Sequence, residues 1–298
     1  MRVTMTTMYD RIKTDLSRIT ERLDRTNSTI SSGKIYQTPS DAPVRLTHAL
    51  GLRDNLADID QFKRNITYGQ GWVKATENAL TGVQDRLQRA KELAIEGAND
   101  TQNKDNRRAI AQEVKNILEE VVSLGNSKLG NRYLFGGSRT TGYDDGELPF
   151  ELDRDGNVVY NGNLEDIRLD VAPGIKQQIN LDGKTTFVDS GTFDALRDLY
   201  DGLMADSQPD IENAIKKLDD SMTYISNQTA RIGAMANSLD VKEDLMDSQK
   251  IINTEILSGV EDTDLIEAIN DLNATQTAYQ AALGAASKVM QVSLADYI

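Results

Sequence analysis

The sequence predicts a mainly α-helical protein: both chain ends form a long antiparallel, coiled-coil-like helical bundle, and a small β-rich domain is inserted between them. Three observations predict this fold. Apolar residues recur every three or four positions over five long runs. The five prolines leave residues 44–148 and 210–298 free of proline, and an interior proline costs a helix about 3 kcal/mol. Glycine and phenylalanine concentrate between 125 and 202, which hold 12 of 21 Gly and four of five Phe.

The helical runs can be followed in order along the chain. The first run has strict 3,4 spacing and consists of Tyr9, Ile12, Leu16, Ile19, Leu23, Thr26 and Ile30. The same spacing recurs over 66–94, 110–124, 211–239 and 265–297. Sustained repeats of this kind predict helices that supercoil around one another along their length. If 44–97 is a single helix, it is roughly 80 Å long at 1.5 Å per residue.

The middle of the chain predicts strands. Pro149–Tyr160 indicates two strands joined by a turn at 153–157, and alternating segments at 167–171 and 179–187 indicate further strands. These strands are expected to pack on one another and on the ends of the long helices. The predicted domains are a terminal coiled-coil assembly domain (1–43 plus 261–298), a helical rod domain (44–132 plus 203–260) and a β-rich inserted domain (133–202).

Composition excludes several classes of function. The chain has no Cys, so disulfides, thiol nucleophiles and Cys-ligated zinc are excluded. Its formal charge of -14 argues against nucleic acid as a partner, because that binding depends on clustered Lys and Arg. No stretch approaches the roughly 20 apolar residues of a membrane span. Residues 1–9 lack the apolar run of a signal peptide, so any export is expected to use another route.

Charge differs between the two ends of the chain. Residues 1–43 hold seven Lys or Arg and five acids, a balance of +2, whereas 261–298 hold one Lys and six acids, a balance of -5. Opposite charge on two heptad helices favours their pairing. Two solvated faces that differ by chance explain the balance equally well.

No motif predicts catalysis, a cofactor or a metal. His48, the single histidine, lies in a predicted helix without the strand-turn-helix context of a nucleophile. Gly183-Lys184-Thr185 resembles the end of a phosphate-binding loop, but position 178 is Gln where that loop needs glycine, which favours a turn between strands. Residues 151–156 have the spacing that opens a calcium loop, but its twelfth position is Gly162. We therefore expect a protein that is not an enzyme.

Three segments resemble bacterial flagellins. ISSGKIYQTPSDAP (30–43) resembles the stretch before the long N-terminal helix of that family, and RIGAMANSL (231–239) and VEDTDL (260–265) resemble its two C-terminal landmarks. The resemblance covers about 1–130 and 210–298, with the motifs in the order of the family. It implies a structural part of the bacterial flagellum, located outside the cell and exported by the flagellar type III apparatus without a cleaved signal peptide.

Details within this resemblance favour the hook-filament junction over the filament itself. NRYLFGG (131–137) and TFDALRDL (192–199) resemble the entry and exit of the variable domain of junction proteins, and the chain ends in SLADYI. Ala42-Pro43-Val44 also departs from the Ala-Ala-Gly common in flagellins. The implied partners are copies of itself, hook-associated protein 1 on the hook side, flagellin on the filament side and an export chaperone, with no nucleic acid and no membrane. Flagellin itself is the alternative, and a cytosolic coiled-coil scaffold is a more distant one.

The terminal apolar seams are the predicted assembly interface. Each seam is too narrow to bury itself alone, so 1–43 and 261–298 are expected to be poorly ordered in a monomer and to fold on assembly. Gln276 and Ser293 in the C-terminal seam either fix register or tolerate partial exposure. The interface residues predicted from the spacing are Ile12, Leu16, Ile19, Leu23, Ile30, Leu265, Ile269, Leu272, Tyr279, Leu283 and Met290.

Overall fold

The protein is described by a computed structural model that covers residues 5–36, 38, 40–99, 102–143, 146–153 and 156–295, with side chains from 7 to 288 within these ranges. The chain divides into two compact units. The first combines Met1–Asp58 with Gln249–Ile298, and the second is Ile59–Ser248. Each unit therefore has its own packing and is described separately.

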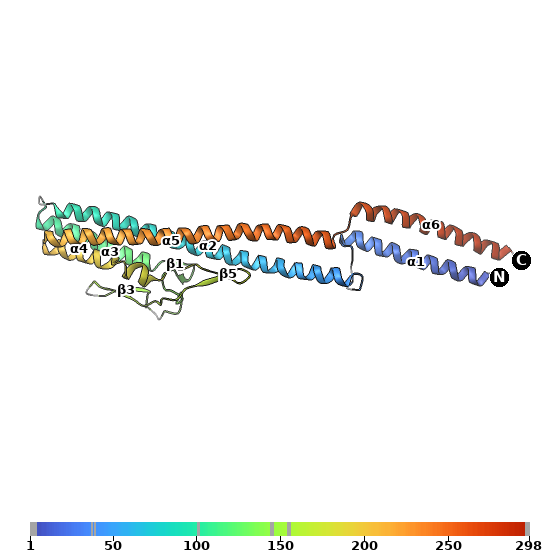
Figure 1. The fold of residues 1–298 in the computed structure, drawn as a ribbon, viewed down its shortest axis with the longest axis horizontal. Coiled ribbons are helices and arrows are strands. Elements are labelled where there is room, and N and C mark those ends of the chain that lie inside the picture. The colour runs from blue at the N-terminus through green and yellow to red at the C-terminus, as the bar shows by residue number, and fades with distance from the viewer. Residues whose placement is uncertain are drawn as a thin grey trace. The chain divides into compact units, whose positions relative to one another are not determined.

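Long helices form most of the chain and confirm the five predicted runs (Figure 1). Pro43 occupies the first helical position of its helix, where the missing N–H costs nothing. Asn103 caps the next helix by accepting a hydrogen bond from the Asn106 N–H at 2.8 Å. The helices are α1 (Met5–Ser32), α2 (Pro43–Ala98), α3 (Lys104–Gly125), α4 (Thr192–Ala205), α5 (Gln208–Glu261) and α6 (Leu265–Ala295).

The inserted region holds three separate antiparallel strand pairs. The predicted hairpin over 149–160 is confirmed, with Phe150 opposite Tyr160, although residues 154 and 155 of its turn lie outside the described ranges. The second predicted strand region is confirmed only over 168–172. The pairs are β1 (Lys128–Leu129) with β2 (Arg132–Tyr133), β3 (Phe150–Leu152) with β4 (Val158–Tyr160), and β5 (Arg168–Ala172) with β6 (Ile175–Gln178).

One strand prediction for this region is wrong. Residues 179–187 do not form a strand, because the chain leaves β6 after Gln178 and Lys184–Val188 forms a π-helical turn. The Asp182 carboxylate accepts a hydrogen bond from the Thr185 N–H at 2.7 Å and so starts this turn. Gly183 is therefore not a turn between strands. Helix α4 occupies the end of the predicted β-rich domain.

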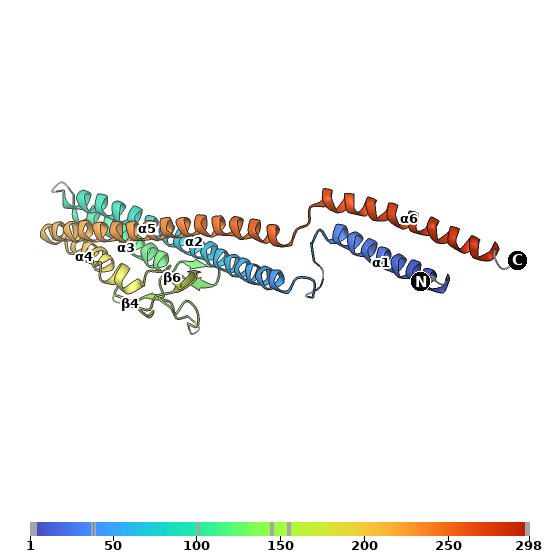
Figure 2. The ribbon, with the colours of Figure 1, turned by 45° about the vertical axis from the view of Figure 1, so that its right-hand side comes forward.

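The second unit has one continuous apolar core. It is built from fully buried side chains such as Leu87 on α2, Leu196 on α4 and Ile225 on α5. The strand pairs lie along the helices of this unit (Figure 2), and the Asn65 amide of α2 donates to the Asp170 carbonyl of β5 at 2.7 Å. Phe150 of β3 packs edge-on against Phe187 at 5.4 Å between ring centroids. The strands thus share a core with the helices of 59–248, as expected, and are not a compact unit of their own.

Candidate assembly interface and joint of the terminal helices

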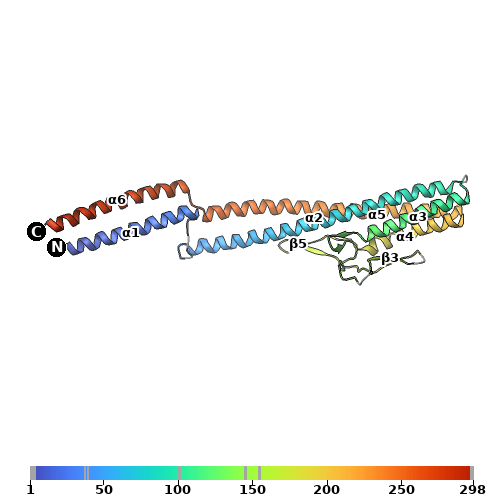
Figure 3. The same ribbon diagram turned by 180° about the vertical axis from the view of Figure 1, so that it is seen from behind.

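The terminal helices α1 and α6 lie side by side and antiparallel, with both chain ends at the same end of the pair (Figure 3). The predicted α1 seam is the inner face of this pair: Thr26 is buried, and the apolar seam residues are half-buried. These half-buried side chains are Ile12, Leu16, Ile19, Leu23 and Ile30. The residues that share the predicted period on α1 therefore lie on one face, toward α6.

On α6 the predicted interface residues divide between two faces. Leu272 and Tyr279 are half-buried, but Leu265, Ile269 and Leu283 are exposed by 50%, 47% and 44%. The covered positions between them are mostly small: Ala268, Thr275, Ala282 and Ala286. Small side chains allow two helices to approach closely, so α6 turns its small residues toward α1 and its large aliphatic residues outward. The side chain of Met290 lies outside the described residues.

An ion pair and a hydrogen bond also connect α1 with α6. The Arg22 guanidinium lies 2.6 Å from the Asp271 carboxylate, and the Thr26 hydroxyl donates to the same carboxylate at 3.2 Å. The hydrogen bond from Arg22 holds the pKa of Asp271 below its usual range. Gln276, considered for register, is exposed on α6. The basic-acidic pairing inferred from the two chain ends is thus realised at Asp271.

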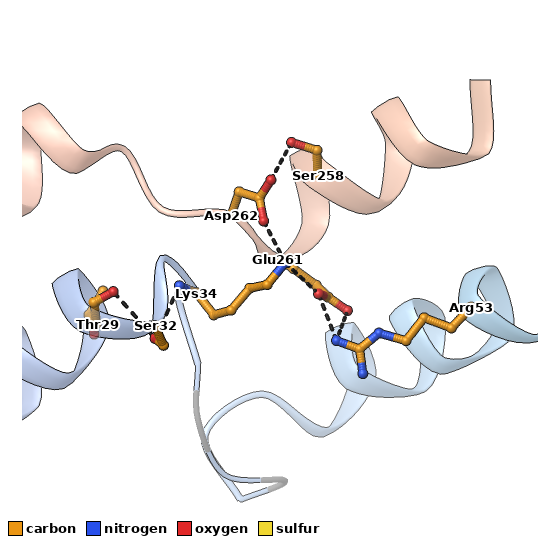
Figure 4. A network of polar contacts seen from close by, with 7 residues as sticks. All are labelled: Thr29, Ser32, Lys34, Arg53, Ser258, Glu261 and Asp262. Carbon is orange, nitrogen blue, oxygen red and sulfur yellow. Dashed lines mark hydrogen bonds and ion pairs between the residues drawn. The ribbon is translucent and has the colours of Figure 1, made fainter. Parts of the chain in front are cut away.

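A second contact, here called the joint, connects residues 33–35 to residues 261–263 (Figure 4). Gly33 ends α1 with φ +70°, a left-handed conformation that suits glycine. The Ile35 N–H donates to the Glu261 carbonyl at 2.7 Å, and the Thr263 N–H donates to the Gly33 carbonyl at 2.9 Å. Lys34 and Asp262 are thereby paired as in an antiparallel sheet, which ties the α1–α2 connection to the α5–α6 connection.

Glu261 is the charged centre of the joint. Its side chain is only 2% exposed and lies 2.8 Å from the Arg53 guanidinium of α2 and 3.0 Å from the Lys34 ammonium. Burial alone would raise the pKa of Glu261, but hydrogen bonds from Lys34 and Arg53 outweigh it and hold this pKa below its usual value. Asp262 accepts from Lys34 at 2.7 Å and from Ser258, and these bonds lower its pKa as well.

Reasoning from sequence missed the joint as a site. A signal was present, because two of the family-like segments, 30–43 and 260–265, contain Lys34 and Glu261. These segments lie more than 200 residues apart in sequence, yet the structure brings them together. Arg53, the third member, carries no comparable signal in the sequence.

Other candidate sites have different roles in the structure. His48 is exposed on α2. Gly183 stands where a Cβ would lie 2.7 Å from the Phe135 carbonyl oxygen, so the close approach of backbone, and not phosphate binding, accounts for this glycine. Within the described ranges, no three His, Asp or Glu side chains are grouped to hold a metal ion, and no helix has the length and apolar character to cross a bilayer.

Both the sequence and the fold of this chain are similar to those of known flagellar proteins. The chain is 26% identical over 292 residues to flagellar hook-associated protein 3 of Escherichia coli K12, with 89% of each chain covered. It is 24% identical over 277 residues to flagellin of Bacillus subtilis 168, with 88% of each covered. The fold is similar to that of Bacillus cereus FlgL (24% identity, 70% of this chain and 99% of that chain covered, TM-score 0.60). It is also similar to that of the flagellar junction protein FlgL of Legionella pneumophila (14% identity, 72% and 99% covered, TM-score 0.60).

Family models cover most of the chain and place both of its helical ends. Residues 3–140 match the bacterial flagellin N-terminal helical region, and residues 215–298 match the bacterial flagellin C-terminal helical region. The resemblance drawn from the three short motifs is thereby confirmed. The chain belongs to the bacterial flagellin family.

Proposed function

We propose that this protein is a structural adaptor at the junction between the flagellar hook and the filament, where it links hook-associated protein 1 to flagellin. Membership of the flagellin family supports a structural role in the flagellum. The observation that carries the junction role is the 26% identity to a hook-associated protein 3 over 89% of both chains. This similarity spans the inserted region as well as the two helical ends.

The terminal pair supplies a physical mechanism for assembly. Its large aliphatic side chains point outward, where an isolated chain leaves them in water and neighbouring subunits would cover them. Subunits of a tube meet head to tail through heterologous contacts, which propagate until a different surface ends them. Leu265, Ile269 and Leu283 would then serve contacts between copies, whereas Leu16, Ile19 and the other predicted α1 residues hold the pair itself. The predicted division into terminal, rod and inserted domains is part of this proposal.

Location and partners follow from the same proposal. The protein would act outside the cell after export by the flagellar type III apparatus, without a cleaved signal peptide and with help from an export chaperone. It would contact copies of itself, the hook-side junction protein and flagellin, and would neither catalyse a reaction nor bind nucleic acid or a membrane.

A deletion strain tests the role directly. We expect cells that still build hooks, lack filaments and release unpolymerised flagellin into the medium, with filaments restored by a plasmid copy. Normal filaments on the deletion strain would overturn the proposal. Purified protein that polymerises alone into long filaments would instead assign the flagellin role, and absence of the protein from sheared flagella would favour a cytosolic scaffold.

A further inference from the structure

The joint carries an inference about how the terminal pair forms. Its ion pairs connect the first 53 residues of the chain with Glu261 and Asp262, and the Lys34–Asp262 ion pair spans 228 positions in sequence. The joint lies at the C-terminal ends of α1 (Ser32) and α5 (Glu261), and α6 begins at Leu265 after three connecting residues. It therefore controls how close the two terminal helices are before they pack.

The apolar packing between α1 and α6 is weak compared with the polar contacts of the joint. The inner face of α6 consists mostly of alanine and threonine, and the apolar residues of α1 that meet it are only half-buried. Single helices of this length are marginal in water without tertiary packing. A contact that holds the two helices near each other raises their effective concentration and so favours their packing. The residues between α1 and α6 do not provide this gain, because they act only after the helices have met.

We propose that the joint is a latch: when Glu261 pairs with Lys34 and Arg53, residues 33–35 and 261–263 are held together and α1 and α6 become ordered as a pair. When the joint opens, both helices lose order together. The charge of Glu261 is the centre of this device, because its side chain is buried while Lys34 and Arg53 remain 40% and 51% exposed. Without that charge, the two cations have water as an alternative partner, and only the two backbone hydrogen bonds and the Lys34–Asp262 ion pair hold the connections together.

The sequence positions of the latch have a consequence that rests on the proposed function. Lys34 and Arg53 lie near the start of the chain, and Glu261 and Asp262 lie near its end. The latch closes only when both ends are in the same compartment. During export through a narrow channel, the terminal assembly surface would therefore form last, after almost the whole chain has left the cell.

Cysteine trapping measures closure of the latch. The chain has no Cys, so Lys34→Cys with Asp262→Cys introduces a single possible disulfide. These changes remove Lys34, so in this background the latch depends on the pairing of Glu261 with Arg53. The hydrogen bonds on either side make these two a non-hydrogen-bonded antiparallel pair, for which Cα atoms lie about 4.5 Å apart, within the range that a disulfide accepts. We would measure the rate of disulfide formation in glutathione buffer on the purified full-length protein.

Two further changes in this background separate charge from shape. Glu261→Gln is expected to slow disulfide formation at least about fivefold, because Arg53 loses its buried partner. Glu255→Gln is the control: Glu255 is an exposed residue of α5 with no ion pair among the described side chains, and its change should leave the rate within about twofold. Equal rates in the parent and the Glu261→Gln variant, or equal slowing by both changes, would overturn the latch.

Hydrogen exchange then tests the coupling between the two helices. Oxidation of the double-cysteine protein is expected to slow exchange in both 7–32 and 265–288 at least about fivefold relative to the same protein after reduction, with 59–248 unchanged. Protection of only one helix, or of neither, would overturn the proposal. The measurement uses isolated protein, so a failure here leaves the junction role intact, and failure of the deletion experiment leaves the latch intact.

Discussion

Replacing Leu283 by Glu should separate folding from assembly. Leu283 lies on the outer face of α6 with 44% of its side chain exposed. Full burial of a leucine contributes about 1.5–3 kcal/mol, so roughly 0.7–1.3 kcal/mol remains for a contact with a neighbouring subunit. A carboxylate in that contact adds the cost of burying an unpaired charge, which reaches about 3 kcal/mol or more. Together these effects predict an affinity between subunits at least about 100-fold lower.

The same change should have little effect on the stability of the isolated chain. Substitutions at exposed positions usually alter the free energy of unfolding by no more than about 0.5 kcal/mol, so urea unfolding of purified Leu283→Glu should match wild type. Leu283→Gln is the matched control, because it removes the apolar contact without adding charge and should weaken assembly about tenfold or less.

The assay is the distribution of exported protein in a complemented deletion strain. For each variant, the amount on sheared flagella is compared with the amount free in the medium by immunoblot. We expect Leu283→Glu to be exported and to remain in the medium, with Leu283→Gln in between. Incorporation of the Glu variant at the wild-type level would refute the assignment of the outer face of α6 to contacts between subunits.

Three further predictions concern stability. Although burial raises the pKa of Glu261, hydrogen bonds from Lys34 and Arg53 outweigh it and hold this pKa below its ordinary value in the fold. The pairing therefore stabilises the first unit above the ordinary pKa of about 4.3, and this stability is lost as the pH falls through the lowered pKa. Hydrogen exchange of α1 and α6, corrected for its intrinsic pH dependence, should accelerate between pH 7 and pH 3, and a flat corrected profile would contradict this. Leu87→Ala, at a fully buried position of α2, should cost about 2–5 kcal/mol in urea unfolding, whereas Ile95→Ala, 56% exposed on the same helix, should cost far less. Gly183→Ala should lower the melting temperature, because the added Cβ would meet the Phe135 carbonyl oxygen. Gly71→Ala, in open space within α2, should raise the melting temperature, because alanine favours a helix more than glycine does. The opposite order would show that small shifts of the neighbouring atoms remove the steric clash at Gly183.

Predictions from sequence succeeded where the signal was local and repeated, and failed where a single side chain decided the local structure. Helices α1, α2, α3, α5 and α6 were predicted because their apolar spacing is a local signal repeated over many turns. Residues 179–187 alternate like a strand, but Asp182 caps a π-helical turn that buries Phe187 in the core, and alternation does not encode that choice. The short helix α4 lies within the glycine-rich segment, where no long apolar period marks it.

The predicted assembly interface does not by itself say which residues of α6 meet α1, for a physical reason. A period of 3.5 residues identifies an apolar stripe, but α6 has covered small residues beside its large exposed ones, and the stripe alone does not say which set meets α1. Close approach of the helices favours the small set. The large set, including Leu265 and Leu283, faces away from α1, so its part in assembly stays a prediction about contacts between copies.

Sequence by itself determined the helical ends, the strand hairpin at 149–160, the absence of cysteine chemistry and the family, because each depends on composition, local periodicity or short motifs. Only the tertiary structure decided the inward face of α6 and the joint around Glu261. Both depend on segments more than 200 positions apart that meet in space, where burial, helix approach and the pairing of a carboxylate with two cations are settled together. A pattern read along one segment contains no information about the partner that completes it.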